Sequence, residues 1–271
     1  MFGVTSAPEK YQQIIKDLLR DCAWVANIAD DLTVHECGVG EYDERLFAML
    51  DRLNEVGLTV YGDECEFRLS KLMFLGHQLT GDGINPCKEK IAAIRDARPP
   101  KDASEVRSFM GLVQYSSKFM LDVAFVAKPV QEFTRKGVVF HWGKKQQTAF
   151  EELKRLITQV ETLAYLKIGC RMRIITDASP VGLGAVFTQQ QGGMWRVVSC
   201  ASRSLTDVER RYSQMEKEAL ALVWACEQFN MYVSGQELET DYKPLEHIYS
   251  STSKPCARIE RWVLKASRVR D

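Results

Sequence analysis

One stretch, Ile174-Ile175-Thr176-Asp177-Ala178-Ser179, constrains the fold of this 271-residue chain more than any other. Its apolar residues predict a buried β-strand that ends by presenting a carboxylate. Gly182 and Gly184 follow, and they predict a tight turn into a second strand. The chain therefore places an acid, Asp177, at the end of a core strand.

Two further acids lie in segments that the sequence predicts to be ordered. Glu218 falls in a long helical segment, and Asp241 closes a short strand-like run, residues 238–241. Hard divalent cations prefer oxygen ligands, so Asp177, Glu218 and Asp241 together predict a site for two magnesium ions that cleaves a phosphodiester. The alternative is that each of the three is an ordinary surface acid.

The composition indicates a globular protein with no overall charge. Hydrophobic residues make up 45% of the chain, charged residues 27%, and the formal net charge is zero, which excludes bulk electrostatic attraction to nucleic acid. Residues 254–271 hold six basic side chains against two acids, which indicates either a local basic patch or a solvated helical face. The eight cysteines show no Cys-x-x-Cys spacing, and no apolar stretch approaches the ~18 residues of a membrane span. We expect a soluble protein of a reducing, intracellular compartment, not a secreted one.

The first third of the chain predicts two helices and two hairpins. A helix begins at Ser6-Ala7-Pro8-Glu9, and a strand, an acidic turn at Asp30-Asp31 and a second strand follow over residues 24–34. A second helix is expected over 43–56, ended by Gly57, and a second hairpin from strands 66–69 and 72–79. Residues 88–160 predict mostly helix, with Asp102 opening one helix after Pro99-Pro100.

The last third changes character to strand, strand, strand, long helix, strand and helix. The three strands are expected over 172–176, 183–189 and 195–201, with Gly192-Gly193 as a hairpin turn. Residues 206–209 are expected to cap the long helix. Its inner face is predicted to comprise Tyr212, Met215, Ala219, Leu222 and Cys226. At 100° per residue, Glu218 falls beside the sheet, whereas Glu216 and Lys217 are expected to turn toward water.

Seven motifs in order resemble the C-terminal part of a gypsy-type long-terminal-repeat retrotransposon reverse transcriptase–ribonuclease H, a fragment of the pol polyprotein. Residues 2–12 are similar to the palm segment under the incoming nucleotide, Asp30-Asp31 to the paired polymerase aspartates, and 74–77 to the hairpin that grips the primer end. Residues 107–115 resemble the thumb helix that tracks the duplex. Residues 176–186, 212–221 and 240–245 resemble the first hairpin, the catalytic helix and the fourth strand of the ribonuclease H domain.

The resemblance implies an α+β fold in three parts. These are a partial reverse-transcriptase palm over 1–82, a mainly helical thumb or connection over 83–165, and a C-terminally truncated ribonuclease H-like mixed-sheet domain over 166–271. It implies RNA-directed DNA polymerase and ribonuclease H activities. Asp30 and Asp31 would be the catalytic and metal-binding residues of the first site, and Asp177, Glu218 and Asp241 those of the second. Each site would take two Mg²⁺ ions, with Mn²⁺ as a substitute.

The implied partners are RNA–DNA hybrid, template-primer nucleic acid and the remainder of the pol polyprotein, in the cytoplasm or in retroelement particles. The sequence also departs from the family's pattern. A polymerase aspartate expected before Phe2-Gly3 and a fourth ribonuclease H carboxylate are missing, and Ile28 stands where the family usually has tyrosine. The alternative is therefore a non-catalytic relic or a nucleic-acid-binding module derived from a retroelement.

Overall fold

The computed structural model describes residues 7–35, 38–234 and 238–240, which form two compact units, Met1–Ser70 and Lys71–Asp271. Helices and small sheets occur in both units, and the expected α+β class is confirmed. The three-part division at residues 82 and 165 stays a prediction. No helix among the described residues is both long and apolar enough to cross a lipid bilayer.

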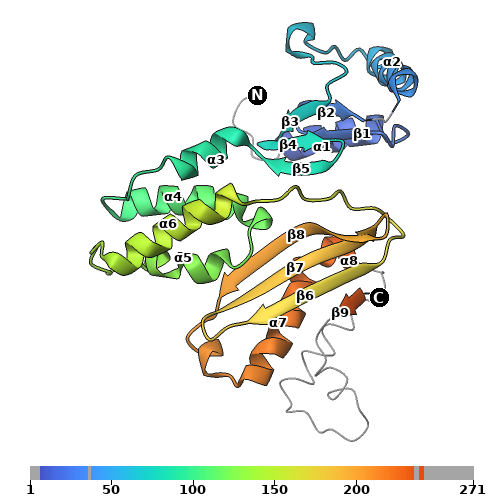
Figure 1. Ribbon diagram of the computed structural model, residues 1–271. Helices are drawn as coiled ribbons and strands as arrows, with labels where there is room; N and C mark the ends of the chain where they lie inside the picture. Colours follow the sequence, from blue (N-terminus) through green and yellow to red (C-terminus); the bar gives the residue numbers. More distant parts are fainter. Residues whose placement is uncertain (1–6, 36–37, 235–237, 241–271) are drawn as a thin grey trace, which may run out of the picture. The chain divides into compact units, whose positions relative to one another are not determined.

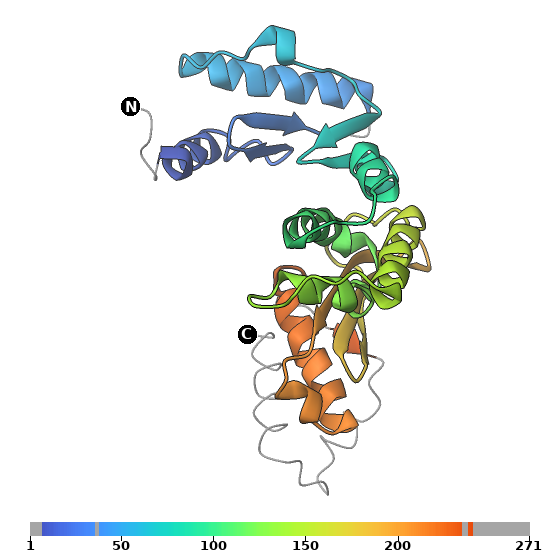
Figure 2. The same cartoon turned by 90° about the vertical axis from the view of Figure 1, so that its left-hand side faces the viewer.

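The first unit packs two helices on a two-stranded hairpin. It contains α1 (Ala7–Leu18), β1 (Val25–Ile28), β2 (Asp31–Val34), α2 (Val39–Glu55) and the short 3-10 turn η1 (Gly62–Glu64). The predicted hairpin is confirmed, with Val25 opposite Val34 and Ile28 opposite Asp31. Figure 2 shows α2 lying along this hairpin. The buried residues that join these elements are Ile15, Leu19, Cys22, Met49 and Leu53.

The predicted second hairpin is wrong in its first strand. Residues 66–69 form no strand, because Arg68 adopts a left-handed φ of 52° that extended pairing does not allow. The second unit instead begins with a three-stranded antiparallel sheet of β3 (Lys71–Phe74), β4 (His77–Thr80) and β5 (Gly83–Pro86). The single strand predicted over 72–79 is a tight hairpin, since Leu75 and Gly76 have φ values of 47° and 69°.

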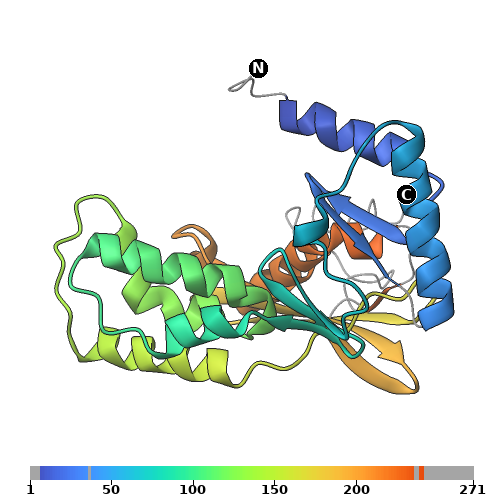
Figure 3. The same cartoon turned by 90° about the horizontal axis from the view of Figure 1, so that it is seen from above.

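Four helices follow, in the stretch that the sequence predicts to be mostly helical, and they share one core. They are α3 (Lys88–Arg95), α4 (Ala103–Ser116), α5 (Val123–Gln131) and α6 (Lys144–Thr158), with 3-10 turns η2 (Ser117–Phe119) and η3 (Glu132–Thr134) between them. The Asp102 side chain accepts hydrogen bonds from Ser104 N at 2.7 Å and Glu105 N at 2.8 Å, so it caps α4 as expected. Figure 3 shows these helices gathered into one group. Phe109, Val113 and Phe150 lie in their core.

The last part is a four-stranded sheet in the order β8-β7-β6-β9. The strands are β6 (Met172–Ala178), β7 (Gly182–Gln191), β8 (Met194–Ser204) and β9 (Leu238–Thr240). β6, β7 and β8 are antiparallel neighbours, whereas β9 runs parallel to β6. The helices α7 (Gln214–Gln228) and α8 (Asn230–Val233) pack against this sheet (Figure 1). The shared core includes Ile174, Phe187, Leu222 and Phe229.

The start and the faces of α7 differ from the prediction. Thr206 and Glu209 exchange hydrogen bonds as a capping box, but they open only the short turn η4 (Glu209–Arg211). The long helix begins at Gln214 and is capped by Ser213 with Glu216. Lys217, expected in water, is 7% exposed, and Met215, expected inside, is 57% exposed. Buried residues surround most of α7, so a single apolar stripe does not describe it.

Candidate active site

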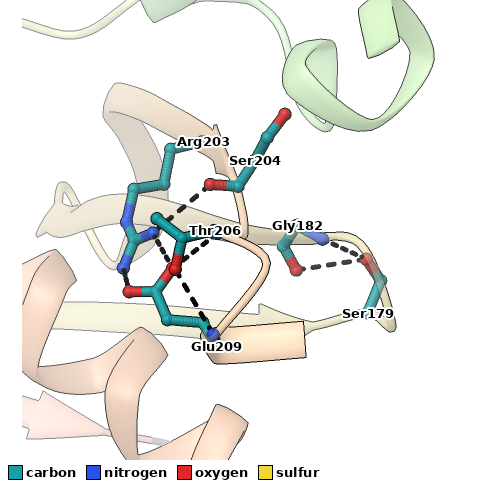
Figure 4. A network of polar contacts seen from close by, with 6 residues as sticks. All are labelled: Ser179, Gly182, Arg203, Ser204, Thr206 and Glu209. Carbon is teal, nitrogen blue, oxygen red and sulfur yellow. Dashed lines mark hydrogen bonds and ion pairs between the residues drawn. The ribbon is translucent and has the colours of Figure 1, made fainter. Parts of the chain in front are cut away.

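Asp177 lies at the carboxyl end of β6, where the sheet opens to solvent. It pairs with Gly184 of β7 in the antiparallel register, and its side chain is exposed. The turn that follows is closed by Ser179, whose hydroxyl donates to Gly182 O at 3.1 Å and accepts from Gly182 N at 2.9 Å (Figure 4). This closed turn fixes the strand end from which the Asp177 carboxylate projects.

Glu218 is brought to the same strand end by one side-chain amide. Gln214 Nε2 donates to the carbonyl oxygen of Ala178 at 2.7 Å and to Glu218 Oε1 at 2.7 Å. Ala178 is the residue after Asp177, so Gln214 ties the first turn of α7 to the end of β6. The Glu218 side chain is partly buried there, as expected for an acid beside the sheet. The structure therefore brings two of the three predicted acids to one edge.

Asp241, the third predicted acid, lies outside the described residues. The described part of β9 ends at Thr240, which pairs with Ile174 of β6. Within the described ranges, no three His, Cys, Asp or Glu residues are grouped closely enough to hold a metal ion. The three-carboxylate site thus stays a prediction that depends on Asp241.

Asp122 is a fourth acid near the site, and the sequence analysis did not identify it. It is the N-cap residue of α5, with a left-handed φ of 55°, and its side chain makes no capping hydrogen bond. A Cβ atom on Gly184 would lie 2.9 Å from Asp122 Oδ1, so this carboxylate lies directly over β7. The pKa of Asp122 is raised, first by burial and then by the negative charge of Asp177. Only the tertiary fold could reveal this neighbour, because the two acids are far apart in sequence.

A cleft of about 190 Å³ lies between the start of α5 and the β6–β7 turn. Its walls come from α5, β6, β7 and β8, and the residues that line it are Asp122, Phe125, Asp177, Ser179, Gly182, Leu183, Gly184 and Ser202. Ala124 N donates to Ser202 Oγ at 3.0 Å, which tethers the first turn of α5 to β8. The helical part and the sheet therefore form this cleft together.

The acids fit a hard cation by their chemistry. Asp177 and Glu218 offer oxygen donors only, the type that Mg²⁺ prefers. The pKa of Asp122 is raised first by burial and then by the negative charge of Asp177, and a cation would offset the second of these causes.

A partly buried ion pair between Arg203 and Glu209 lies at the connection between β8 and η4. Arg203 donates to Glu209 through two nitrogens, at 2.8 Å and 2.9 Å, and Glu209 also accepts from Thr206 N (Figure 4). The hydrogen bonds from Arg203 are the main cause that lowers the pKa of Glu209 to about 2. Since both side chains are engaged with each other, the pair holds the β8–η4 connection in place.

Asp30 and Asp31 lie together on the β1–β2 hairpin of the first unit, and both are exposed. Asp30 is in the turn and Asp31 is the first residue of β2. Gln12 of α1 fixes this hairpin, because its side chain donates to Asn27 O and Asn27 Oδ1 and accepts from Ala29 N. The predicted hairpin with both acids at its turn is thus present, and hydrogen bonds from α1 hold it in place. The proposed metal-binding role of the two acids stays a prediction.

Three antiparallel strands, a parallel fourth strand, a backing helix and an acid at the end of the first strand define a ribonuclease H-like domain. Residues 142–240 match the family model described as an RNase H-like domain found in reverse transcriptase. The chain is also 32% identical over 271 residues to the retrovirus-related Pol polyprotein from transposon 297 of Drosophila melanogaster, covering 98% of this chain and 25% of that protein. It is 26% identical to the transposon Tf2-3 polyprotein of Schizosaccharomyces pombe, covering 97% and 20%.

The resemblance to a retrotransposon Pol polyprotein that the sequence indicates is therefore confirmed. The chain spans about a fifth to a quarter of the length of these curated relatives. Among solved structures, it is similar in fold to the foamy viral protease-reverse transcriptase in complex with RNA/DNA hybrid. The TM-score is 0.83 at 20% identity, and the match covers 100% of this chain and 37% of that one. The same enzyme in complex with dsDNA matches with a TM-score of 0.83 and covers 58% of that chain.

Proposed function

We propose that this chain is a piece of a retroelement Pol polyprotein whose ribonuclease H-like domain cleaves the RNA strand of RNA–DNA hybrids. The observation that carries the proposal is the placement of Asp177 and Glu218 at one strand end, joined through Gln214. Relatives that are Pol polyproteins and a fold neighbour described with an RNA/DNA hybrid support the substrate class. Its partners would be the hybrid, template-primer nucleic acid and the rest of the polyprotein, inside the cell.

The three acids share one role in the proposed site. Asp177 and Glu218, together with Asp241, would supply the oxygen ligands for two Mg²⁺ ions, with Mn²⁺ as a substitute. Bound magnesium would activate a water molecule and stabilise the departing 3′ oxygen. Gln214 would orient Glu218, because its amide fixes one carboxylate oxygen. The 2′-hydroxyl groups of the RNA strand would distinguish hybrid from DNA duplex.

Hybrid cleavage by the full chain tests this proposal. With end-labelled RNA in a hybrid and Mg²⁺ or Mn²⁺, we expect Asp177→Asn and Glu218→Gln to lower the cleavage rate by about 100-fold or more. The reason is that loss of a residue that only orients a metal ligand lowers metal affinity or activity by about 10–100-fold, and loss of a ligand itself lowers it more. Gln214→Ala should lower the cleavage rate within this 10–100-fold range, since it removes a residue that orients Glu218 and that also ties α7 to Ala178, but no metal ligand.

Two matched variants serve as controls. Asp207→Asn removes an exposed acid of the same unit, and Glu227→Gln removes an acid at the far end of α7. Both should cleave like the wild type. Equal cleavage by wild type and Asp177→Asn, or no cleavage by either, would remove the catalytic proposal. Hybrid binding without cleavage would favour the alternative, a non-catalytic relic or nucleic-acid-binding module.

The second candidate function is a polymerase role for Asp30 and Asp31. It is favoured because both side chains are exposed at the turn of a hairpin that Gln12 holds in place. It would require a further carboxylate and a nucleotide-binding surface. Template-primer extension assayed with Asp30→Asn and Asp31→Asn would separate a catalytic tip from an acidic turn.

A further inference from the structure

The first two turns of α5 carry an exposed aromatic side chain into the Asp177 cleft. Phe125 is 53% exposed and lines the cleft together with Asp177, although α5 is otherwise packed through Val123, Ala127 and Val130. An apolar ring that stays half in water beside a cluster of acids gains little for the fold. Such a ring is available to pack against a ligand.

A basic side chain accompanies this ring on the same helix face. Lys128 is partly buried and follows Phe125 by three residues, a spacing that puts two side chains side by side on a helix. Aromatic rings with neighbouring cations are the combination that binds nucleic-acid strands, because the ring packs on bases or sugars and the cation pairs with phosphate.

The position of α5 is fixed with respect to the sheet. Ala124 N is bonded to Ser202 of β8, and the Asp122 carboxylate lies over Gly184 of β7. Both contacts are made by residues just before Phe125 on the chain, so they fix the start of the helix that carries the ring. α5 also lies outside residues 142–240, the range that the ribonuclease H-like family model covers.

We propose that Phe125, assisted by Lys128, is a substrate-binding residue that packs against the hybrid strand entering the Asp177 cleft. The inference rests on the nuclease function proposed above. It adds that specificity comes partly from the helical part that precedes the ribonuclease H-like domain.

Binding and cleavage are measured separately on the full chain. Anisotropy of a labelled RNA–DNA hybrid in Ca²⁺ reports binding, and cleavage in Mg²⁺ reports KM and kcat. We expect Phe125→Ala to weaken hybrid binding and raise KM by about tenfold, the lower range for loss of one stacking side chain, with kcat nearly unchanged. Phe125→Trp should restore both, and Lys128→Gln should weaken binding less and reduce its salt dependence.

The controls distinguish this inference from the proposed function. Val139→Ala removes another exposed apolar side chain, 85% exposed in the η3–α6 loop, and should bind like the wild type. Hybrid binding by Phe125→Ala and a second variant, Phe125→Gln, at wild-type affinity would overturn the inference while leaving the nuclease proposal standing. A wild-type protein that binds the hybrid but does not cleave it would overturn the nuclease proposal. The hybrid affinity of Phe125→Ala, compared with that of the wild type, would still show whether Phe125 binds the hybrid. A wild type that binds no hybrid overturns both.

Discussion

Arg203 and Glu209 form the most strongly coupled ion pair near the cleft. Their side chains are 28% and 17% exposed, so solvent screens them less than it screens the surface pairs of this chain. Arg203 also lies 5.6 Å from the centre of the Trp224 ring on α7. The pair thus links β8, the short turn η4 and α7, and its loss should loosen the connection that sets the start of α7.

We expect Glu209→Gln to lower the free energy of unfolding by about 1–3 kcal/mol at neutral pH. The folded-state pKa of Glu209 is about 2, below its ordinary value of 4.5. Its stabilising contribution is therefore fully present above pH 4.5 and is lost as the pH falls toward 2. Urea unfolding of wild type and Glu209→Gln should differ at neutral pH and converge in acid. A difference that does not shrink at low pH would contradict this account.

The acids of the site show what residue patterns can and cannot predict. The positions of Asp177 at a strand end and of Glu218 on a helix face beside the sheet could be predicted, because each has a local signature in the sequence. Asp122 was not predicted, because it comes close to the site only through the packing of α5 over β7. The local sequence contains no pattern that indicates this packing. Phe125 was missed for the same reason, since an apolar residue in an amphipathic helix is expected to be buried.

At the scale of elements, the β3–β4 hairpin is held against α4 by an aromatic stack. His77 stacks on Tyr115 with ring centres 4.9 Å apart and planes 12° apart, and the Tyr115 hydroxyl donates to the carbonyl of Leu75. Lys90 Nζ lies 3.2 Å from the centre of the Tyr115 ring. The pKa of His77 is lowered to about 4, first by burial and then by the charges of Lys118 and Lys90.

This stack should make hairpin docking sensitive to acid. A histidine with an ordinary pKa of 6.5 that is held neutral to about 4 contributes stability that is present above 6.5 and is lost as the pH falls toward 4. His77→Phe keeps a ring for the stack and removes the titration. Urea midpoints followed across this range should fall for the wild type and fall less for His77→Phe. Identical pH dependence in the two proteins would exclude His77 as the source.

Some helices and strands were predicted correctly from the sequence and others were not. Strands 172–176, 183–189 and 195–201 and the helices of 88–160 were predicted correctly, because periodicity and Gly or Pro boundaries agree there. The missing strand over 66–69 and the division of the predicted strand 72–79 into β3 and β4 depend on backbone turns at Arg68 and Gly76, whose positive φ values the residue pattern did not indicate. The burial of Lys217 depends on neighbours that cover α7 from several sides.

At the scale of the whole molecule, the apolar core is distributed unequally between the two units. Among the described residues, the first unit has one cluster of five buried apolar residues, whereas the second has clusters of thirteen, eleven and four. The first unit also exposes large apolar side chains, among them Tyr61 at 70%, Phe47 at 62% and Ile14 at 62%. Burial of apolar surface is the main favourable term in folding, so the units should differ in stability.

We therefore expect calorimetry of the full chain to show two transitions, with residues 7–70 unfolding at the lower temperature. Leu53 is 3% exposed in the first unit and Ile157 is 0% exposed in the second, which gives a matched pair of probes. Leu53→Ala should lower only the first transition and Ile157→Ala only the second, each through a loss of about 2–5 kcal/mol from a core cavity. Limited proteolysis with mass mapping should cut first within residues 7–70. Survival of that segment while residues 71–234 are digested would reverse the predicted order of stability. A single transition shifted by both variants would show that the two units fold as one cooperative body.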